Sequence, residues 1–135
     1  MSTADYVRLL GPMKLDAYEV AFPSLPWLAP VRPFDAWSSE APTQSLTWYD
    51  AYNGVKHNRE REFERASLGN AFLAVSAVVV MLAAQFSRSI GLGGHSDLSA
   101  FFRFSARPTW SPAELYIDFS EGGEDWSPAP LWPEG

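Results

Sequence analysis

Length, charge and cysteine content narrow the classes of protein to which this chain can belong. Its 135 residues are enough for one domain with its own hydrophobic core. With no cysteine the chain can form neither disulfides nor thiolate metal sites, and a formal net charge of -6 argues against a surface that binds nucleic acid without sequence preference. The N-terminus lacks the basic start and apolar stretch of a secretory signal, so we expect a cytoplasmic protein.

The N-terminal segment predicts a short helix followed by an ambiguous stretch. The helix is expected over Ala4–Leu10, with Ser2 or Thr3 as its N-cap and Gly11-Pro12 as its end. Residues 13–22 fit either a helix or a strand. Their large apolar side chains recur at a helical spacing, which favours a helix: Leu15, Tyr18 and Phe22.

A proline-rich arm follows over residues 23–45. Prolines at 23, 26, 30, 33 and 42 forbid a continuous helix there. We expect three aromatic side chains to pin this arm, in an extended form, onto the helices: Trp27, Phe34 and Trp37.

Residues 46–88 predict a hairpin of two helices that forms the core of the domain. The first helix is expected over Leu46–Asn58, with Ser45 as its N-cap. The charged residues 59–65 either form a loop or continue this helix.

The second helix of the hairpin is predicted over Leu68–Ser87, with Ser67 as its N-cap. Its apolar residues lie all round, which indicates a helix enclosed by neighbours. The uninterrupted apolar run of 14 residues, counting Ser76, is shorter than the roughly 20 needed to span a bilayer, so we expect a buried helix and no membrane span. One side of the helix carries bulky residues: Leu68, Phe72, Val75, Val79, Leu82 and Phe86. Another side carries small residues, so a second helix could approach it closely: Ala74, Ala77 and Ala84.

The rest of the chain predicts little regular structure. Leu98–Phe104 fits a short helix or a strand, and Leu115–Phe119 has weak strand character, so a small C-terminal β-hairpin is one alternative. Residues 105–135 otherwise form a second extended arm. Its apolar anchors are Trp126, Leu131 and Trp132.

One face of the first hairpin helix gathers residues that can carry out chemistry. Residues three, four or seven apart share a helix face, so Asp50, Asn53 and His57 line up, with Arg61 beneath them if the helix continues. Two cations flank this row: Lys56 and Arg59. His57 can exchange a proton near neutral pH and the cations can hold a phosphate, which are the parts that metal-independent RNA cleavage requires. The alternative is a solvated polar face beside the core.

We expect no cofactor and no metal. The chain has only two His and no Cys, too few soft ligands for a metal site at His95. The Gly-rich run over residues 91–94 lacks the Lys-Ser/Thr pair of a phosphate-binding loop.

A longer motif runs Tyr52-Asn53-Gly54-Val55-Lys56-His57-Asn58-Arg59 and continues through Phe63 and Ala66-Ser67-Leu68 into the Ala/Val-rich helix. It resembles the HEPN superfamily, a group of small helical bundles that includes many ribonucleases of toxin–antitoxin and antiviral systems. That family places an Arg, often followed by Asn, before a His on one helix. Asn53 and His57 match the Asn and the His of that pattern, whereas Tyr52 stands where the family has Arg.

The resemblance implies a mainly α, HEPN-like hairpin or bundle in one domain, and two classes of function. In the first, the chain is a non-catalytic, RNA-associated or dimerisation module of a bacterial system, with Tyr52, Asn53 and His57 in a buried hydrogen-bond network. In the second, it is a metal-independent ribonuclease of a toxin or antiviral system. Its site would then comprise His57, Arg59, Asn53 and Lys56 as catalytic residues and Arg61, Tyr52 and Asp50 as substrate contacts. The missing Arg favours the first class. The implied partners are RNA, a second copy of the chain and an antitoxin-like protein.

Overall fold

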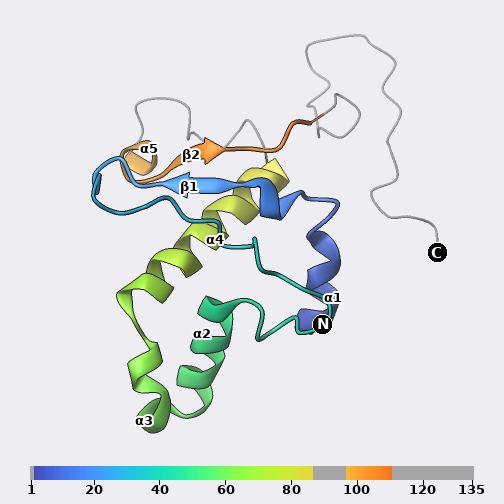
Figure 1. The fold of residues 1–135 in the computed structure, drawn as a ribbon, viewed down its shortest axis with the longest axis vertical. Helices are drawn as coiled ribbons and strands as arrows, with labels where there is room; N and C mark the ends of the chain where they lie inside the picture. The colour runs from blue at the N-terminus through green and yellow to red at the C-terminus, as the bar shows by residue number, and fades with distance from the viewer. Residues whose placement is uncertain (1, 87–96, 111–135) are drawn as a thin grey trace, which may run out of the picture.

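The computed structural model describes residues 2–86 and 97–110, and its arrangement is shown in Figure 1. About half of these residues are helical and two short strands form one antiparallel sheet, which confirms a mainly α fold. In chain order the elements are α1 (Thr3–Tyr6), η1 (Val7–Leu9), η2 (Leu15–Ala17), β1 (Glu19–Ala21), α2 (Thr47–His57), α3 (Arg59–Glu62), η3 (Phe63–Arg65), α4 (Leu68–Phe86), α5 (Asp97–Phe101) and β2 (Arg103–Ala106).

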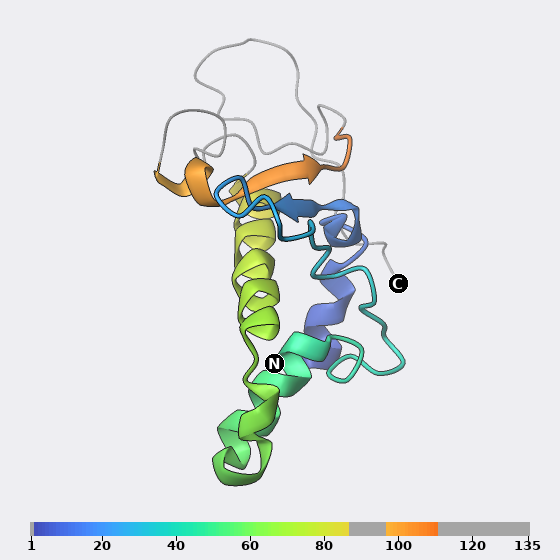
Figure 2. The same ribbon diagram turned by 60° about the vertical axis from the view of Figure 1, so that its left-hand side comes forward.

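Helix α4 is the longest element, and the others are arranged along it. The sheet crosses the C-terminal half of α4, while α2 and α3 lie towards its N-terminal end (Figures 1 and 2). The predicted start of α4 is confirmed, because the Ser67 Oγ accepts the backbone N–H of Asn70 at 3.2 Å. The predicted hairpin is confirmed in its two helices, which contact each other, with α3 and η3 between them.

The sheet brings together segments that are far apart in the sequence. Val20 on β1 lies opposite Phe104 on β2, in an antiparallel register. Val20 also exchanges two backbone hydrogen bonds with Val31 of the proline-rich arm, at 2.8 and 2.9 Å. The prediction of a helix over residues 13–22 is therefore wrong beyond the short turn η2. Val20 is fully buried, and its long-range pairing prevails over the weak local preference for a helix.

The segment predicted as a helix or a strand over residues 98–104 contains both. It begins in α5 and continues into β2, whose partner is β1. The other predicted half of a C-terminal hairpin, residues 115–119, lies outside the described residues, as do the Gly-rich run with His95 and the tail anchors Trp126, Leu131 and Trp132.

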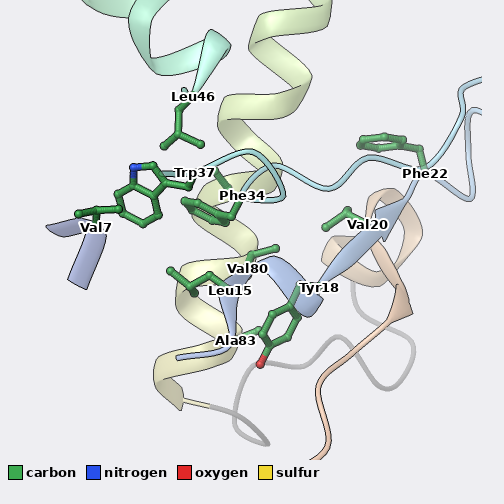
Figure 3. Packing of buried hydrophobic residues seen from close by; sticks show 11 residues of the cluster. Val7, Leu15, Tyr18, Val20, Phe22, Phe34, Trp37, Leu46, Val80 and Ala83 are labelled. Atoms are coloured by element: carbon green, nitrogen blue, oxygen red, sulfur yellow. The ribbon is translucent and has the colours of Figure 1, made fainter. Parts of the chain in front are cut away.

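The hydrophobic core forms where α4 meets β1, η2 and the proline-rich arm. Val80 of α4 is fully buried, as are Leu15 and Val20 (Figure 3). Aromatic rings close the edges: Tyr18 stacks edge-on against Phe104, with ring centroids 5.2 Å apart. The cluster of buried residues comprises Val7, Leu15, Tyr18, Val20, Phe22, Phe34, Trp37, Leu46, Ala77, Val80 and Ala83.

Two of the three predicted aromatic anchors hold the proline-rich arm in place. Phe34 and Trp37 are buried, at 3% and 8% exposure, and the Trp37 indole N–H donates to the Pro42 carbonyl at 2.9 Å. Trp27 is 79% exposed, so its prediction as an anchor was wrong. The arm is extended as expected, since proline prevents helix formation and the anchors fix the path between them.

The start of α2 differs slightly from the prediction. Leu46, not Ser45, is in the N-cap position. The Ser45 hydroxyl is used elsewhere, because it accepts the backbone N–H of Ser38 at 3.0 Å and so ties the end of the arm to the helix.

Ser76 is the one buried polar residue in the described part of the chain, and its hydroxyl has no hydrogen-bond partner there. A buried unsatisfied hydroxyl costs about 1–3 kcal/mol, and Ala also has the higher helix propensity. We therefore expect Ser76→Ala to stabilise the protein by about 1 kcal/mol in urea unfolding, with exposed Ser39→Ala as a neutral control. A loss of stability in Ser76→Ala would contradict this account.

Candidate functional site

Helix α2 carries the row of polar residues that the sequence singles out. Its helical conformation covers Asp50, Asn53 and His57, so the three share a face as predicted. The helix ends at His57, however, because Asn58 leaves helical geometry with φ −144° and ψ 70°. Arg61 belongs to the separate helix α3 and does not extend the row.

The predicted site residues do not form an enclosed cleft. Asp50 and Asn53 are half-buried, whereas Tyr52 and His57 are exposed, which excludes a buried hydrogen-bond network containing all of Tyr52, Asn53 and His57. Three cations are exposed as well: Lys56, Arg59 and Arg61. Among the described residues, no hydrogen bond or ion pair joins His57 to any of the others. Lys56 lies over the Tyr52 ring, with its Nζ 5.9 Å from the ring centroid.

Arg65 is the residue that organises this end of the molecule. Its guanidinium forms ion pairs with the Asp50 carboxylate on α2 and, at 3.1 Å, with Glu62 on α3. Its backbone carbonyl accepts the Asn70 side-chain amide at 2.9 Å. Hydrogen bonding to Asp50 and then to Glu62 raises the pKa of Arg65.

Gly54 leaves room for this arrangement. A Cβ at that position would lie 2.9 Å from the Arg65 Nη1 and 3.3 Å from a Glu62 carboxylate oxygen. The Arg65 guanidinium therefore lies against the glycine face of α2. We call Asp50, Glu62 and Arg65 the hairpin clasp.

The clasp is partly solvent-exposed, so we expect it to hold the α2–α3 turn locally without dominating global stability. Arg65→Ala should speed amide hydrogen exchange in residues 59–66 and leave the thermal midpoint nearly unchanged. Arg59→Ala, which removes an exposed cation from the same turn, is the matched control and should not speed exchange. If amide hydrogen exchange in residues 59–66 is unchanged in Arg65→Ala, the clasp does not hold the α2–α3 turn.

An apolar groove of about 340 Å³ lies where α1, the proline-rich arm, the start of α2 and α4 meet. It is lined by Thr3 and Tyr6 from α1, by Phe34 and Trp37 from the arm, and by residues near the start of α2 and in the C-terminal half of α4. The α4 contribution includes Val78 and Leu82. Concave, mainly apolar surfaces are typical of binding sites.

The groove continues into an exposed apolar stripe along α4. Several side chains of the stripe are 41–74% exposed: Leu68, Val75, Val78 and Leu82. They face away from Ala77, Val80 and Ala83, which are buried in the core. Helix α4 thus has two apolar faces, and only one of them is covered in the described structure. The prediction of a helix enclosed by its neighbours is wrong for the other face.

No cofactor site emerges from the described part of the chain. It contains no cluster of three or more His, Asp or Glu residues that could hold a metal ion. In comparisons with family models, curated proteins and solved structures, no significant match to the chain was found.

Sequence reasoning missed both Arg65 and the groove. Arg65 is 15 residues from Asp50, beyond any spacing that places two residues on one helix face. The groove requires four separate segments to come together: α1, the arm, the start of α2 and α4. The apolar stripe of α4 did leave a signal in the sequence. The bulky side that the sequence predicts for this helix includes three residues of the stripe: Leu68, Val75 and Leu82.

Proposed function

We propose that this protein is a non-catalytic, HEPN-like helical module whose function is to associate, in the first place with a second copy of itself. The observation that carries this proposal is the uncovered apolar face of α4. Val75 and Val78 lie near the middle of the helix and are 48% and 58% exposed. A contiguous exposed apolar surface of this kind marks an interaction site, whereas apolar residues scattered singly do not.

The polar end of α2 supports association more than catalysis. Asp50 is held in the hairpin clasp and so is not free to orient an imidazole. His57 lies on the outer surface, where water keeps the local dielectric high and weakens electrostatic catalysis.

The second candidate is the ribonuclease, which is favoured by one observation. His57, Lys56 and Arg59 are all exposed at the same turn, where a phosphate could reach them. If this site cleaves RNA, His57→Ala will abolish cleavage while leaving the thermal midpoint unchanged. The proposal predicts no cleavage of single-stranded RNA by the purified protein above the level of His57→Ala.

A lipid bilayer is the other environment that could cover α4. Among the described residues, Leu68–Phe86 is the one helix long and apolar enough to cross a membrane by length and composition, and 28% of its most apolar window is buried in the protein. The buried share includes Val80 and Ala83, which pack in the core with β1 and η2, so lipid could not surround the helix without dismantling that core. The proposal therefore includes no membrane contact, and it keeps the cytoplasmic location that the sequence led us to expect. Flotation of the protein with phosphatidylcholine vesicles would contradict it.

Self-association is tested by co-expressing two copies of the chain, one with an affinity tag and one without. We expect the tagged copy to capture the untagged copy in a one-to-one ratio after washing in high salt, because apolar contacts are not screened by salt. Recovery of the tagged copy alone would contradict the proposed function.

A further inference from the structure

The groove beside α1 is distinguished from the open face of α4 by its aromatic lining. Five of its lining residues are aromatic: Tyr6, Phe34, Trp37, Trp48 and Tyr49. The Trp37 indole N–H donates to the Pro42 carbonyl at 2.9 Å, which fixes the orientation of that ring. The Trp48 indole N–H is held in the same way by the Pro33 carbonyl, at 2.8 Å. Grooves lined by aromatic rings are typical docking sites for proline-rich segments.

The chain contains such a segment outside the described residues. Residues 126–133 read Trp-Ser-Pro-Ala-Pro-Leu-Trp-Pro, and they include two prolines three residues apart, Pro130 and Pro133. This Pro-x-x-Pro spacing is the one that aromatic-lined grooves bind. The prolines also restrict the backbone in advance, so that docking the segment costs less conformational entropy than docking an ordinary one.

Charge and hydrogen bonding of the groove fit segment 126–133. Asp125 and Glu134 border the segment, which itself carries no charge. In the described structure none of the lining residues is charged either, so docking would bury no unpaired charge. A proline-rich segment has no hydrogen bonds of its own between backbone groups. Its carbonyls need donors, and three lining residues have side chains that can donate: Tyr6, Tyr49 and Gln85.

The position of Trp110 brings the groove within reach of segment 126–133. The Lys14 ammonium donates to the Thr109 carbonyl at 2.9 Å and lies 4.5 Å from the centroid of the Trp110 ring. Tyr6 of the groove precedes Lys14 by eight residues. It therefore lies within about 29 Å of Lys14, even if the chain between them were fully extended at about 3.6 Å per residue. Residues 111–125 can span roughly 50 Å at about 3.3 Å per residue.

We propose that residues 126–133 dock in the groove of their own chain, with Pro130 and Pro133 against its aromatic rings. The tether favours this occupant over a separate proline-rich protein, because it gives the segment an effective concentration that is roughly millimolar. Among the described residues, Leu68 and Val75 of the α4 stripe stand outside the groove lining. The docked segment leaves them uncovered, so this inference goes beyond the proposed function and does not rest on it.

The absence of cysteine from the chain allows the contact to be measured with two introduced thiols. Gln85→Cys places one thiol on the exposed part of the groove lining, and Ala129→Cys places the other in the middle of the segment. The fraction of disulfide formed within one chain in glutathione buffers gives the effective concentration of the two thiols. Leu68→Cys with Ala129→Cys is the matched control, because Leu68 is 74% exposed on the same helix but lies outside the groove.

We expect the effective concentration of the Gln85→Cys/Ala129→Cys pair to exceed that of the control pair at least tenfold. Adding Pro130→Ala and Pro133→Ala should lower it to the control value, which separates docking from mere nearness of the two thiols. Circular dichroism checks that each variant keeps its helices. Equal values in the two pairs, or a high value that persists without both prolines, would overturn the inference. Disulfides that join two chains would also overturn it, because the segment would then dock on another copy, and the proposed association would stand.

Discussion

Val78→Glu is expected to convert the proposed dimer into a monomer. Val78 is 58% exposed in the single chain and lies in the middle of the α4 stripe. In the proposed pair it becomes buried, and a carboxylate there has no partner to neutralise it. Burying an unpaired charge is among the most costly changes a protein interface can undergo. We expect the dissociation constant to rise at least a hundredfold, about 2.8 kcal/mol.

The fold of the single chain should tolerate this change, because the Val78 side chain faces away from the core. Far-UV circular dichroism and the thermal midpoint of the monomer should stay close to those of the parent protein. Phe63→Glu is the matched control, since Phe63 is 64% exposed but lies outside α4. A Phe63→Glu variant that dissociates, or a Val78→Glu variant that stays dimeric, would contradict the assignment of the interface.

Trp37→Ala is expected to cost about 3–5 kcal/mol of unfolding free energy, which is the usual cost of truncating a buried Trp. The indole is 8% exposed, and its ring lies 5.3 Å from that of Phe34. Its loss leaves a cavity and an unpaired Pro42 carbonyl, which normally accepts the indole N–H. This cost is a large fraction of the unfolding free energy of a typical domain, which is about 5–15 kcal/mol.

Trp27→Ala provides the comparison within the same arm. Trp27 is 79% exposed, so its removal should change stability by less than about 0.5 kcal/mol. Urea unfolding followed by circular dichroism measures both variants, and avoids fluorescence from the six Trp of the chain. Equal losses in the two variants would show that burial of Trp37 does not hold the arm in place.

The helices were predictable because their signals are local. Ser67 caps α4 as its sequence context indicates, and the apolar run that follows makes up most of the helix. Strand β1 was not predictable in the same way. Val20 is held by partners on two other segments, Phe104 and Val31, and no local spacing reveals such pairing. The exposure of Trp27 was missed for a related reason, since composition does not tell which aromatic residue of an arm finds a pocket.

The candidate site was predicted in its helix position but not in its environment. The structure does place Asp50, Asn53 and His57 on one face of α2. Asp50, however, pairs with Arg65 in the hairpin clasp, and Arg65 lies beyond the end of α2. The sequence does not show that one face of α4 is uncovered, because the same apolar residue types occur at positions that contact the core and at positions that contact another molecule. The HEPN resemblance and the roles that it implies for His57, Arg59 and Lys56 stay predictions.

Sedimentation equilibrium over a series of protein concentrations tests the central claim most directly. Since one chain has a mass of 15.0 kDa, a pair through α4 should give about 30 kDa, twice that value, and dilution should lower it towards 15.0 kDa. A mass of one chain at every concentration, with the protein folded and free of lipid and detergent, would contradict the account.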